Sequence, residues 1–200
     1  MIHLNNSGYH FILGSQSPRR QFLLHETGLN FEVLVKPIVE IFPANLKAEE
    51  IALYVSKEKA MVFDLNELPD KSLIITADTI VWFDDKKFGK PLSHTEAKTM
   101  LQKLSGRKHV VSTGVCFRTI DRLHTFYVNT DVYFRNLEED EIDYYIDTFK
   151  PYDKAGAYGI QEWIGYVGVE RIDGSYFNVM GLPVQRVYAE LQKFINHQGA

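Results

Sequence analysis

Short apolar runs alternate with amphipathic segments along the chain, and this alternation predicts successive strands and helices. The predicted strands cover residues 11–13, 31–35, 73–83, 109–119, 123–135 and 163–171. The predicted helices cover residues 17–27, 47–63, 93–104, 138–149 and 183–195. Adjacent strands favour hairpins, whereas strands separated by a helix favour crossovers. We therefore expect an α/β protein with a mixed sheet.

Local signals define several helix ends. The segment from Ser93 to Glu96 has the form of a capping box, and Gly106 follows the end of the helix that it opens. The helix over 138–149 stops before Pro151, because a residue that precedes proline disfavours helical backbone.

The segment Gly14–Arg20 predicts a turn from the first strand into a helix. Ser17 suits the N-cap and Pro18 the first helical position. Arg19 and Arg20 then fall in the first turn, where the helix dipole disfavours positive charge unless an anion compensates it. Backbone N–H groups, serine hydroxyls and two guanidinium groups suit a phosphate chain. A capped surface helix whose arginines face water explains the same pattern equally well.

Asp78 interrupts the apolar run over 73–83. An ionised carboxylate inside a buried strand costs several kcal/mol unless it is paired, hydrogen-bonded or bound to a metal. One interpretation is a carboxylate at a strand end or bulge that faces a site as general base or metal ligand. The other is a turn aspartate between two shorter strands.

Lys59 is a second charge near an apolar face. The apolar face of the helix over 47–63 consists of Ile51, Val55 and Val62. Lys59 falls at the edge of that face, and Glu58 near its middle. Either both side chains pair or extend to solvent, or the lysine points at a phosphate group.

Two loops contain further polar groups. The segment Phe88–Pro91 presents Lys90 between residues that restrain the backbone. The segment Tyr152–Gln161 is rich in glycine and alanine, which permit close approach of backbone to a ligand, and it carries Lys154.

Composition limits the function classes. The chain is 45% hydrophobic and 24% charged, which is typical of a globular protein, and its net charge of −4 argues against a broad nucleic-acid interface. The single cysteine, Cys116, excludes an intramolecular disulfide and fits a reducing compartment. The pattern at 1–10 predicts no signal peptide, and no apolar run reaches the ~20 residues of a membrane span. We expect a cytoplasmic protein without membrane or nucleic-acid partners.

Ten short segments, in this order, resemble the Maf family of nucleoside triphosphate pyrophosphatases from Ile12 to Phe194. They are Ser15–Arg20, Glu40, Glu58–Ala60, Ala77–Thr79, Gly89–Pro91, Leu104–Arg107, Thr130–Val132, Asp153–Gln161, Gly174–Tyr176 and Gly181–Pro183. The resemblance implies the inosine-triphosphatase-like fold, an elongated mixed sheet with flanking helices and two lobes around a central cleft. It also implies a single domain over 1–200, with a catalytic core at 10–195 and an extension at 1–9.

The resemblance assigns roles to individual residues. Glu40 would be a carboxylate at a divalent cation, Mg²⁺ or Mn²⁺, and Asp78 would either accept a proton or help to hold that cation; the sequence does not separate these two roles. The expected catalytic residues are Asp78, Lys59 and Lys90. The expected substrate-binding residues are Ser15, Ser17, Arg19, Arg20, Thr79, Lys154 and Gln161. Within this set, Arg20 would join Lys59 and Lys90 at the phosphate chain, whereas Arg19, Thr79 and Gln161 would govern substrate choice.

The implied reaction converts a nucleoside triphosphate and water into the monophosphate and pyrophosphate. The segment Asp153–Gln161 resembles the branch that acts on dTTP and UTP, including modified pyrimidine triphosphates. The alternatives are the branch acting on 7-methyl-GTP and a non-catalytic, nucleotide-binding regulator of cell division. A homodimer is the family expectation. Val39 departs from the family pattern, which has an acidic residue there.

Overall fold

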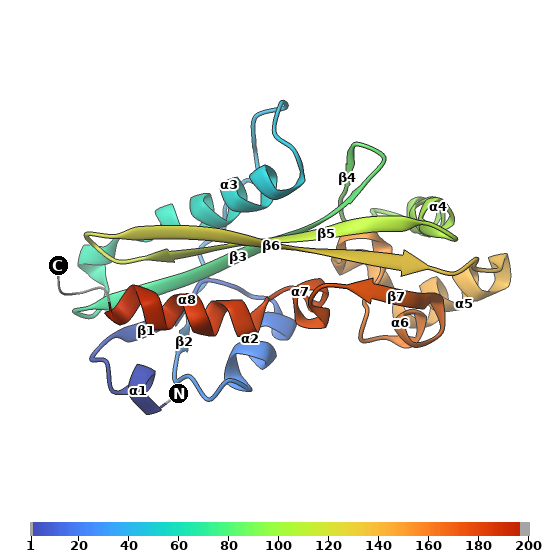
Figure 1. The fold of residues 1–200 in the computed structure, drawn as a ribbon. Helices are drawn as coiled ribbons and strands as arrows, with labels where there is room; N and C mark the ends of the chain where they lie inside the picture. Colours follow the sequence, from blue (N-terminus) through green and yellow to red (C-terminus); the bar gives the residue numbers. More distant parts are fainter. Residues whose placement is uncertain (1, 197–200) are drawn as a thin grey trace.

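The computed structural model describes residues 2–196, with side chains from Leu4 onward. Its centre is a seven-stranded mixed sheet in the order β2-β1-β3-β5-β6-β7, with β4 paired to β3. The strands are β1 (His10–Leu13), β2 (Glu32–Val33), β3 (Ser72–Phe83), β4 (Lys86–Phe88), β5 (Lys108–Arg118), β6 (Leu123–Phe134) and β7 (Val169–Asp173). The three long antiparallel strands β3, β5 and β6 run along most of the molecule (Figure 1).

Eight helices flank the sheet in the described part of the chain. They are α1 (Ile2–Asn5), α2 (Pro18–His25), α3 (Ala48–Met61), α4 (His94–Leu104), α5 (Glu139–Phe149), α6 (Trp163–Gly168), α7 (Tyr176–Met180) and α8 (Val184–Asn196). Short 3-10 turns occur at Leu65–Glu67, Pro151–Asp153 and Ala155–Ala157. The expected α/β fold with a mixed sheet is confirmed.

The sequence prediction was wrong over 163–171, where we expected one strand. The structure forms the short helix α6 first, and only β7 pairs with β6. A Cβ atom on Gly165 would lie 1.8 Å from the carbonyl oxygen of Ile160, so this turn packs against the preceding loop more closely than any side chain allows. Packing against the preceding loop therefore overrides the strand-like composition of the segment.

The helices cover both faces of the sheet and form two main cores. Helix α3 lies on one face of β3 and β5, while α8, with α1 and α2, lies on the other (Figure 1). The first core includes Leu24, Phe117 and Leu191 at this end of the sheet. The second includes Leu101 of α4 and Ile146 of α5 at the opposite end. Two packed ends thus flank the middle of β3.

The N-terminal segment packs on the first core. Leu4 of α1 is buried, and Asn5 accepts a hydrogen bond from the backbone N–H of Asn30 at 2.9 Å and donates to the carbonyl of Gly28 at the same distance. Leu4 and Asn5 therefore attach helix α1, which lies within the expected extension, to the body of the protein.

A gap in the sheet lies beside the middle of β3. Strand β1 pairs with residues 72–75 of β3, and β4 pairs with residues 81–83. Residues 76–80 thus pair with β5 on one side and have no partner strand of the described chain on the other. Asp78 lies in this interval, directly opposite Gly114 of β5. Both expectations for Asp78, a strand end or bulge and a turn, were wrong: β3 is continuous, and its neighbour is interrupted.

Helix α3 buries Ile51 and Val55 as its sequence predicts, but the rest of its buried face differs. Its buried side chains are Ala48, Ile51, Ala52, Val55, Ser56 and Ala60. Val62 is 40% exposed just beyond the helix, and Glu58 is exposed, so the expected positions of both were wrong. Gly114 permits this packing, because a Cβ atom there would lie 2.3 Å from the backbone of Ala52. Small residues bring α3 close to the sheet beside Asp78.

None of the helices within residues 2–196 is long and apolar enough to cross a membrane.

Candidate active site

A cavity of about 830 Å³ opens at the gap in the sheet. Its walls come from the turn after β1, the loop before α3, the middle of β3, the segment around β4, the loop 153–161 and the end of α7. Every site residue predicted from the sequence lines it. These are Ser15, Ser17, Arg19, Arg20, Glu40, Lys59, Asp78, Thr79, Lys90, Lys154 and Gln161.

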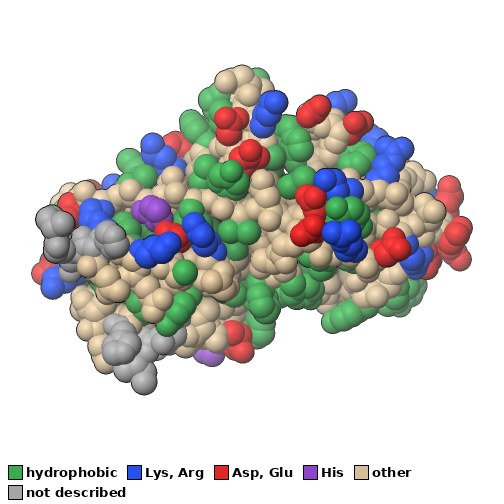
Figure 2. Space-filling model, in the orientation of Figure 1, with side chains coloured by type: hydrophobic (Ala, Val, Ile, Leu, Met, Phe, Trp, Pro, Cys, Tyr) green, Lys and Arg blue, Asp and Glu red, His purple; other side chains and the backbone are tan. Residues whose placement is uncertain are grey.

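The charge of the cavity is opposite in sign to that of the protein. Seven lysine and arginine side chains line it against three carboxylates, although the whole chain carries a net charge of −4. On the face shown in Figure 2, by contrast, basic and acidic side chains are intermixed and form no continuous basic band. The concentration of cations in one cleft suits a compact polyanion.

Lys59 lies between two carboxylates. Its ammonium nitrogen is 2.7 Å from Oδ1 of Asp78 and 2.8 Å from Oε1 of Glu40. The Asp78 side chain is 9% exposed and that of Glu40 is 43% exposed. We call these three residues the β3 triad. The pairing explains how a carboxylate survives in an otherwise apolar strand, and it places Lys59 in the cleft rather than in solvent.

The β3 triad keeps unused acceptors. The described residues donate no hydrogen bond to Oδ2 of Asp78 or to Oε2 of Glu40. Partial burial acts to raise the pKa of Glu40, but the hydrogen bond and charge of Lys59, with Lys87 and Lys90 nearby, hold that pKa below its ordinary value. Glu40 is therefore ionised at neutral pH.

Arg20 is anchored to the protein by all three of its nitrogens. Nε donates to the carbonyl of Gly181 and Nη1 to that of Ala77, both at 2.8 Å, while Nη2 donates to Oγ1 of Thr79 at 2.9 Å. Burial lowers the pKa of Arg20, with Asp78 acting in the opposite direction. Thr79 also contacts Oγ1 of Thr113 at 2.9 Å. Arg20 is thus a rigid part of the cleft wall.

The turn before α2 differs in one detail from the sequence prediction. Ser17 occupies the N-cap and Pro18 begins α2, as expected, but the Ser17 side chain makes no capping hydrogen bond. Instead, the N–H of Ser17 donates to Oγ of Ser15 at 3.3 Å. Nη1 of Arg19 forms an ion pair with Oδ2 of Asp153 at 3.1 Å. The two neighbouring arginines therefore have different partners: Arg19 pairs with a carboxylate, whereas Arg20 donates to two backbone carbonyls and a hydroxyl.

The loop 153–161 holds a second lysine between two carboxylates. Nζ of Lys154 lies 2.6 Å from Oδ1 of Asp153 and 3.0 Å from Oε1 of Glu162, and the Lys154 side chain is 9% exposed. We call these residues the loop triad. Gln161, next to Glu162, has a buried Oε1 that receives no hydrogen bond from the described chain. Lys90 also lines the cavity, and it has no ion-pair partner among residues 4–196.

Several cleft residues were missed by the sequence analysis. Lys36, Lys87 and Tyr158 line the cavity, and Gly181 supplies the carbonyl that holds Arg20. Tyr158 and Gly181 lie in two of the segments that carry the family resemblance but received no role there, and no pattern marks Lys36. Charge density around Lys90 was the one signal that could have indicated Lys87.

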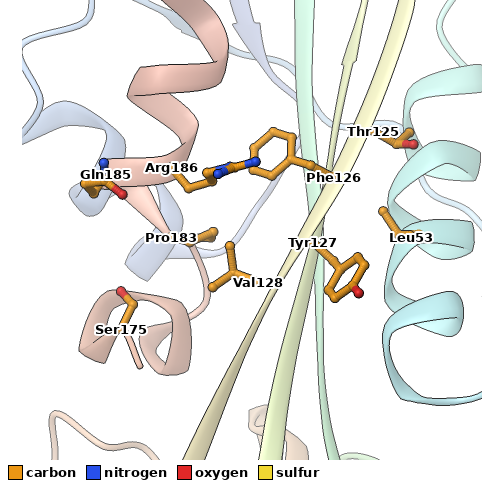
Figure 3. A pocket seen from close by; sticks show the side chains of 9 residues that line it. All are labelled: Leu53, Thr125, Phe126, Tyr127, Val128, Ser175, Pro183, Gln185 and Arg186. Atoms are coloured by element: carbon orange, nitrogen blue, oxygen red, sulfur yellow. The ribbon is translucent and has the colours of Figure 1, made fainter. Parts of the chain in front are cut away.

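A second cavity, of about 650 Å³, lies along β6 (Figure 3). Tyr127 points from β6 toward the side of α3, and Val128 lies on the side of α8, where Arg186 enters the same space. Arg186 pairs with Glu190 at 3.1 Å and is the only charged side chain among the lining residues. This cavity lacks the titratable groups of the cleft, and we therefore place the functional site in the cleft.

The carboxylates of the β3 triad fit a divalent cation that is shared with a phosphate ligand. Magnesium is commonly bound by one or two carboxylates together with substrate phosphates. Glu40 and Asp78 contact one ammonium group, so they are close to each other. No group of three His, Cys, Asp or Glu side chains in the described chain could hold a metal by itself. The protein would thus supply only two carboxylates, and a phosphate ligand or water would have to complete the coordination of a cation.

Comparison with known proteins gives the class to which this geometry belongs. The family model described as Maf-like protein matches residues 10–194, and the chain therefore belongs to the Maf family. The chain is 55% identical over 190 residues to a dTTP/UTP pyrophosphatase of Phocaeicola vulgatus, covering 94% of this chain and 98% of that protein. It is 50% identical over 190 residues to a protein of the same name from Bacteroides fragilis, with the same coverage of both chains. The expected family is confirmed.

Proposed function

We propose that this protein is a nucleoside triphosphate pyrophosphatase that hydrolyses dTTP and UTP, with modified pyrimidine triphosphates as further substrates. The observation that supports this proposal most directly is that one cleft contains several lysine and arginine side chains together with two carboxylates that each keep an unpaired oxygen. The names of the relatives described above support the same nucleotides. The products are a nucleoside monophosphate and pyrophosphate.

The residues of the cleft suit each requirement of this hydrolysis. Water attacks the α-phosphorus, its proton passes to a base, and negative charge develops on the leaving pyrophosphate. The open Oδ2 of Asp78 is the acceptor for that proton. Lys59 and Lys90 would neutralise the phosphate oxygens, and Lys59 would exchange a carboxylate for a phosphate as substrate enters.

Glu40 would hold a divalent cation, Mg²⁺ or Mn²⁺, together with the phosphate chain, and Asp78 would join it through the oxygen that Lys59 releases when it moves to a phosphate. Such an ion, when bound, neutralises phosphate charge and lowers the pKa of coordinated water. Arg20 would act as a fixed wall through its three protein contacts and direct its remaining N–H groups toward phosphate.

The other side of the cleft would bind the base. Gln161 lines the cleft, and rotation of its side-chain amide would let the unpaired Oε1 accept the N3–H of uracil or thymine, which cytosine lacks. Arg19 and Thr79 are the further residues that we assign to substrate choice. The buried free thiol of Cys116 is compatible with a cytoplasmic location, which we propose together with the absence of a nucleic-acid partner.

Pyrophosphate release tests this proposal directly. The panel contains dTTP, UTP, CTP, 7-methyl-GTP and the purine triphosphates, each with Mg²⁺, Mn²⁺ or Co²⁺. We expect dTTP and UTP to give the highest kcat/KM. A preference for 7-methyl-GTP would move the protein to the other family branch, and nucleotide binding without pyrophosphate from any triphosphate would favour the non-catalytic regulator.

A further inference from the structure

A hydrogen-bond network extends behind the loop triad into the second core. One carboxylate oxygen of Glu162 accepts from Lys154, and the other accepts from the hydroxyl of Tyr145. The oxygen of that hydroxyl accepts from the backbone N–H of Gly159 at 3.0 Å. Two side chains thereby connect helix α5, the loop 153–161 and the start of α6.

Neither Tyr145 nor Glu162 lines the cleft, yet both bind groups that do. Tyr145 is fully buried on α5, and Lys154 is 8% exposed. A buried ammonium group in such a position needs hydrogen-bond acceptors on the protein side, and Glu162 is the acceptor that lies away from the cleft. The orientation of Lys154 therefore depends on Glu162.

The same pair fixes the backbone around Gln161. A Cβ atom on Gly159 would lie 2.9 Å from the carboxylate of Glu162 and 3.1 Å from Nε2 of Gln161. These three residues are therefore in close contact, and the N–H of Gly159 is held by Tyr145. If the hydroxyl is removed, the turn that carries Gln161 loses its hydrogen bond to α5.

We propose that Tyr145 and Glu162 are positioning residues that set Lys154 and Gln161 for nucleotide recognition without contacting the nucleotide. The proposal rests on the proposed function, because Lys154 and Gln161 are assigned there to substrate binding. It predicts effects on substrate affinity and base choice, and little effect on the chemical step at the β3 triad.

Steady-state kinetics with dTTP and CTP provide the first test. In Tyr145→Phe and Glu162→Ala we expect KM for dTTP to rise about tenfold, the change produced by losing a hydrogen bond to a charged group, with kcat within about twofold. The preference for dTTP over CTP should fall in both variants. Glu162→Gln, which keeps the shape and one oxygen acceptor, should recover part of the affinity.

Tyr144→Phe is the matched control, because Tyr144 is the neighbouring tyrosine on α5 and is 51% exposed. It should leave KM and kcat unchanged. A purely structural role for Tyr145 and Glu162 would lower the thermal midpoint and the active fraction, and hence kcat, at constant KM. That result would overturn the proposal.

Lysine acetylation with mass spectrometry tests positioning without using activity. Lys154 should react slowly in the wild-type protein and several-fold faster in Tyr145→Phe and Glu162→Ala, while the exposed Lys150 reacts equally in all three. Unchanged labelling of Lys154 in both variants would overturn the proposal. A wild-type protein that hydrolyses no triphosphate would instead refute the proposed function, and the labelling result would still decide whether the pair positions Lys154.

Discussion

Two lysines of the cleft each lie between two carboxylates. The two triads differ in whether all of their carboxylate oxygens contact protein hydrogen-bond donors. In the loop triad both oxygens of Asp153 and both of Glu162 contact protein donors. In the β3 triad one oxygen of Asp78 and one of Glu40 receive no hydrogen bond from residues 4–196. A saturated network holds its members in place, whereas open acceptors are available for a proton or a cation. The first arrangement suits recognition and the second suits chemistry.

The two triads also depend on different parts of the sequence. The members of the loop triad lie within ten residues of one another, at positions 153, 154 and 162. Those of the β3 triad come from the loop before α3, from α3 and from β3. Local backbone geometry can form the loop triad, but only the packing of α3 on the sheet forms the β3 triad.

The largest effect should come from the substitution Asp78→Asn. It keeps the shape of the side chain and removes the proton acceptor, so we expect kcat for dTTP to fall by about 10²–10⁴-fold. Pyrophosphate release measures the rate, and circular dichroism checks that the variant folds. Activity within tenfold of wild type would show that Asp78 is not the base and would remove the chemical distinction between the triads.

Glu40→Gln should act on metal dependence. Because Glu40 is an expected ligand, the Mg²⁺ or Mn²⁺ concentration for half-maximal activity should rise by about 10–100-fold, with activity partly restored at high metal concentration. The exposed Glu26 provides a control, since Glu26→Gln should leave the metal titration unchanged. Superimposable titrations for Glu40→Gln and wild type would contradict the metal assignment.

Gly114→Ala should test the dependence of the β3 triad on helix packing. The new methyl group would lie 2.3 Å from the backbone of Ala52 and displace α3, so we expect a loss of about 1–3 kcal/mol in the free energy of unfolding. Guanidinium denaturation measures this loss. Gly89→Ala is the control for stability, because its Cβ atom would meet nothing within 4 Å and should change stability by about 0.5 kcal/mol or less.

The smallest effect should be a pH dependence at the loop side of the cleft. Nε2 of His109 contacts the hydroxyl of Tyr158 at 2.7 Å, and burial lowers the pKa of His109 to about 3. The unfolded chain binds a proton at this histidine near its ordinary pKa of 6.5, but the folded chain does not. The free energy of unfolding should therefore fall as pH falls from 6.5 toward 3, by up to ~1.4 kcal/mol per unit.

The variant His109→Gln isolates this contribution. Between pH 7.5 and 5.5 its free energy of unfolding should change by about 1 kcal/mol less than that of the wild type. His25→Gln, at a histidine whose side chain is 80% exposed, should keep the wild-type dependence. Equal slopes for His109→Gln and wild type would refute the contribution of His109.

The elements that sequence predicted well are those with local signals. Ser93 caps α4 by accepting from the N–H of Glu96 at 3.2 Å. Helix α5 ends at Phe149 and is followed by the left-handed Lys150 and then by Pro151. The hairpin β5–β6 also follows the predicted segments. Where the pattern was ambiguous, at α6, the prediction was wrong because the contact between Gly165 and Ile160 is invisible in a linear pattern.

The sequence by itself determined the family, the mixed α/β class and part of the cleft lining, namely the predicted site residues, because motif identity and hydrophobic periodicity are local properties. Tertiary structure alone decided that β3 continues through Asp78 while its neighbour is interrupted. It also decided that Lys59 joins Asp78 to Glu40 and that Tyr145 and Glu162 support Lys154. These contacts join residues that are distant along the chain or hidden behind the cleft, so they form only when sheet pairing and helix packing bring their elements together.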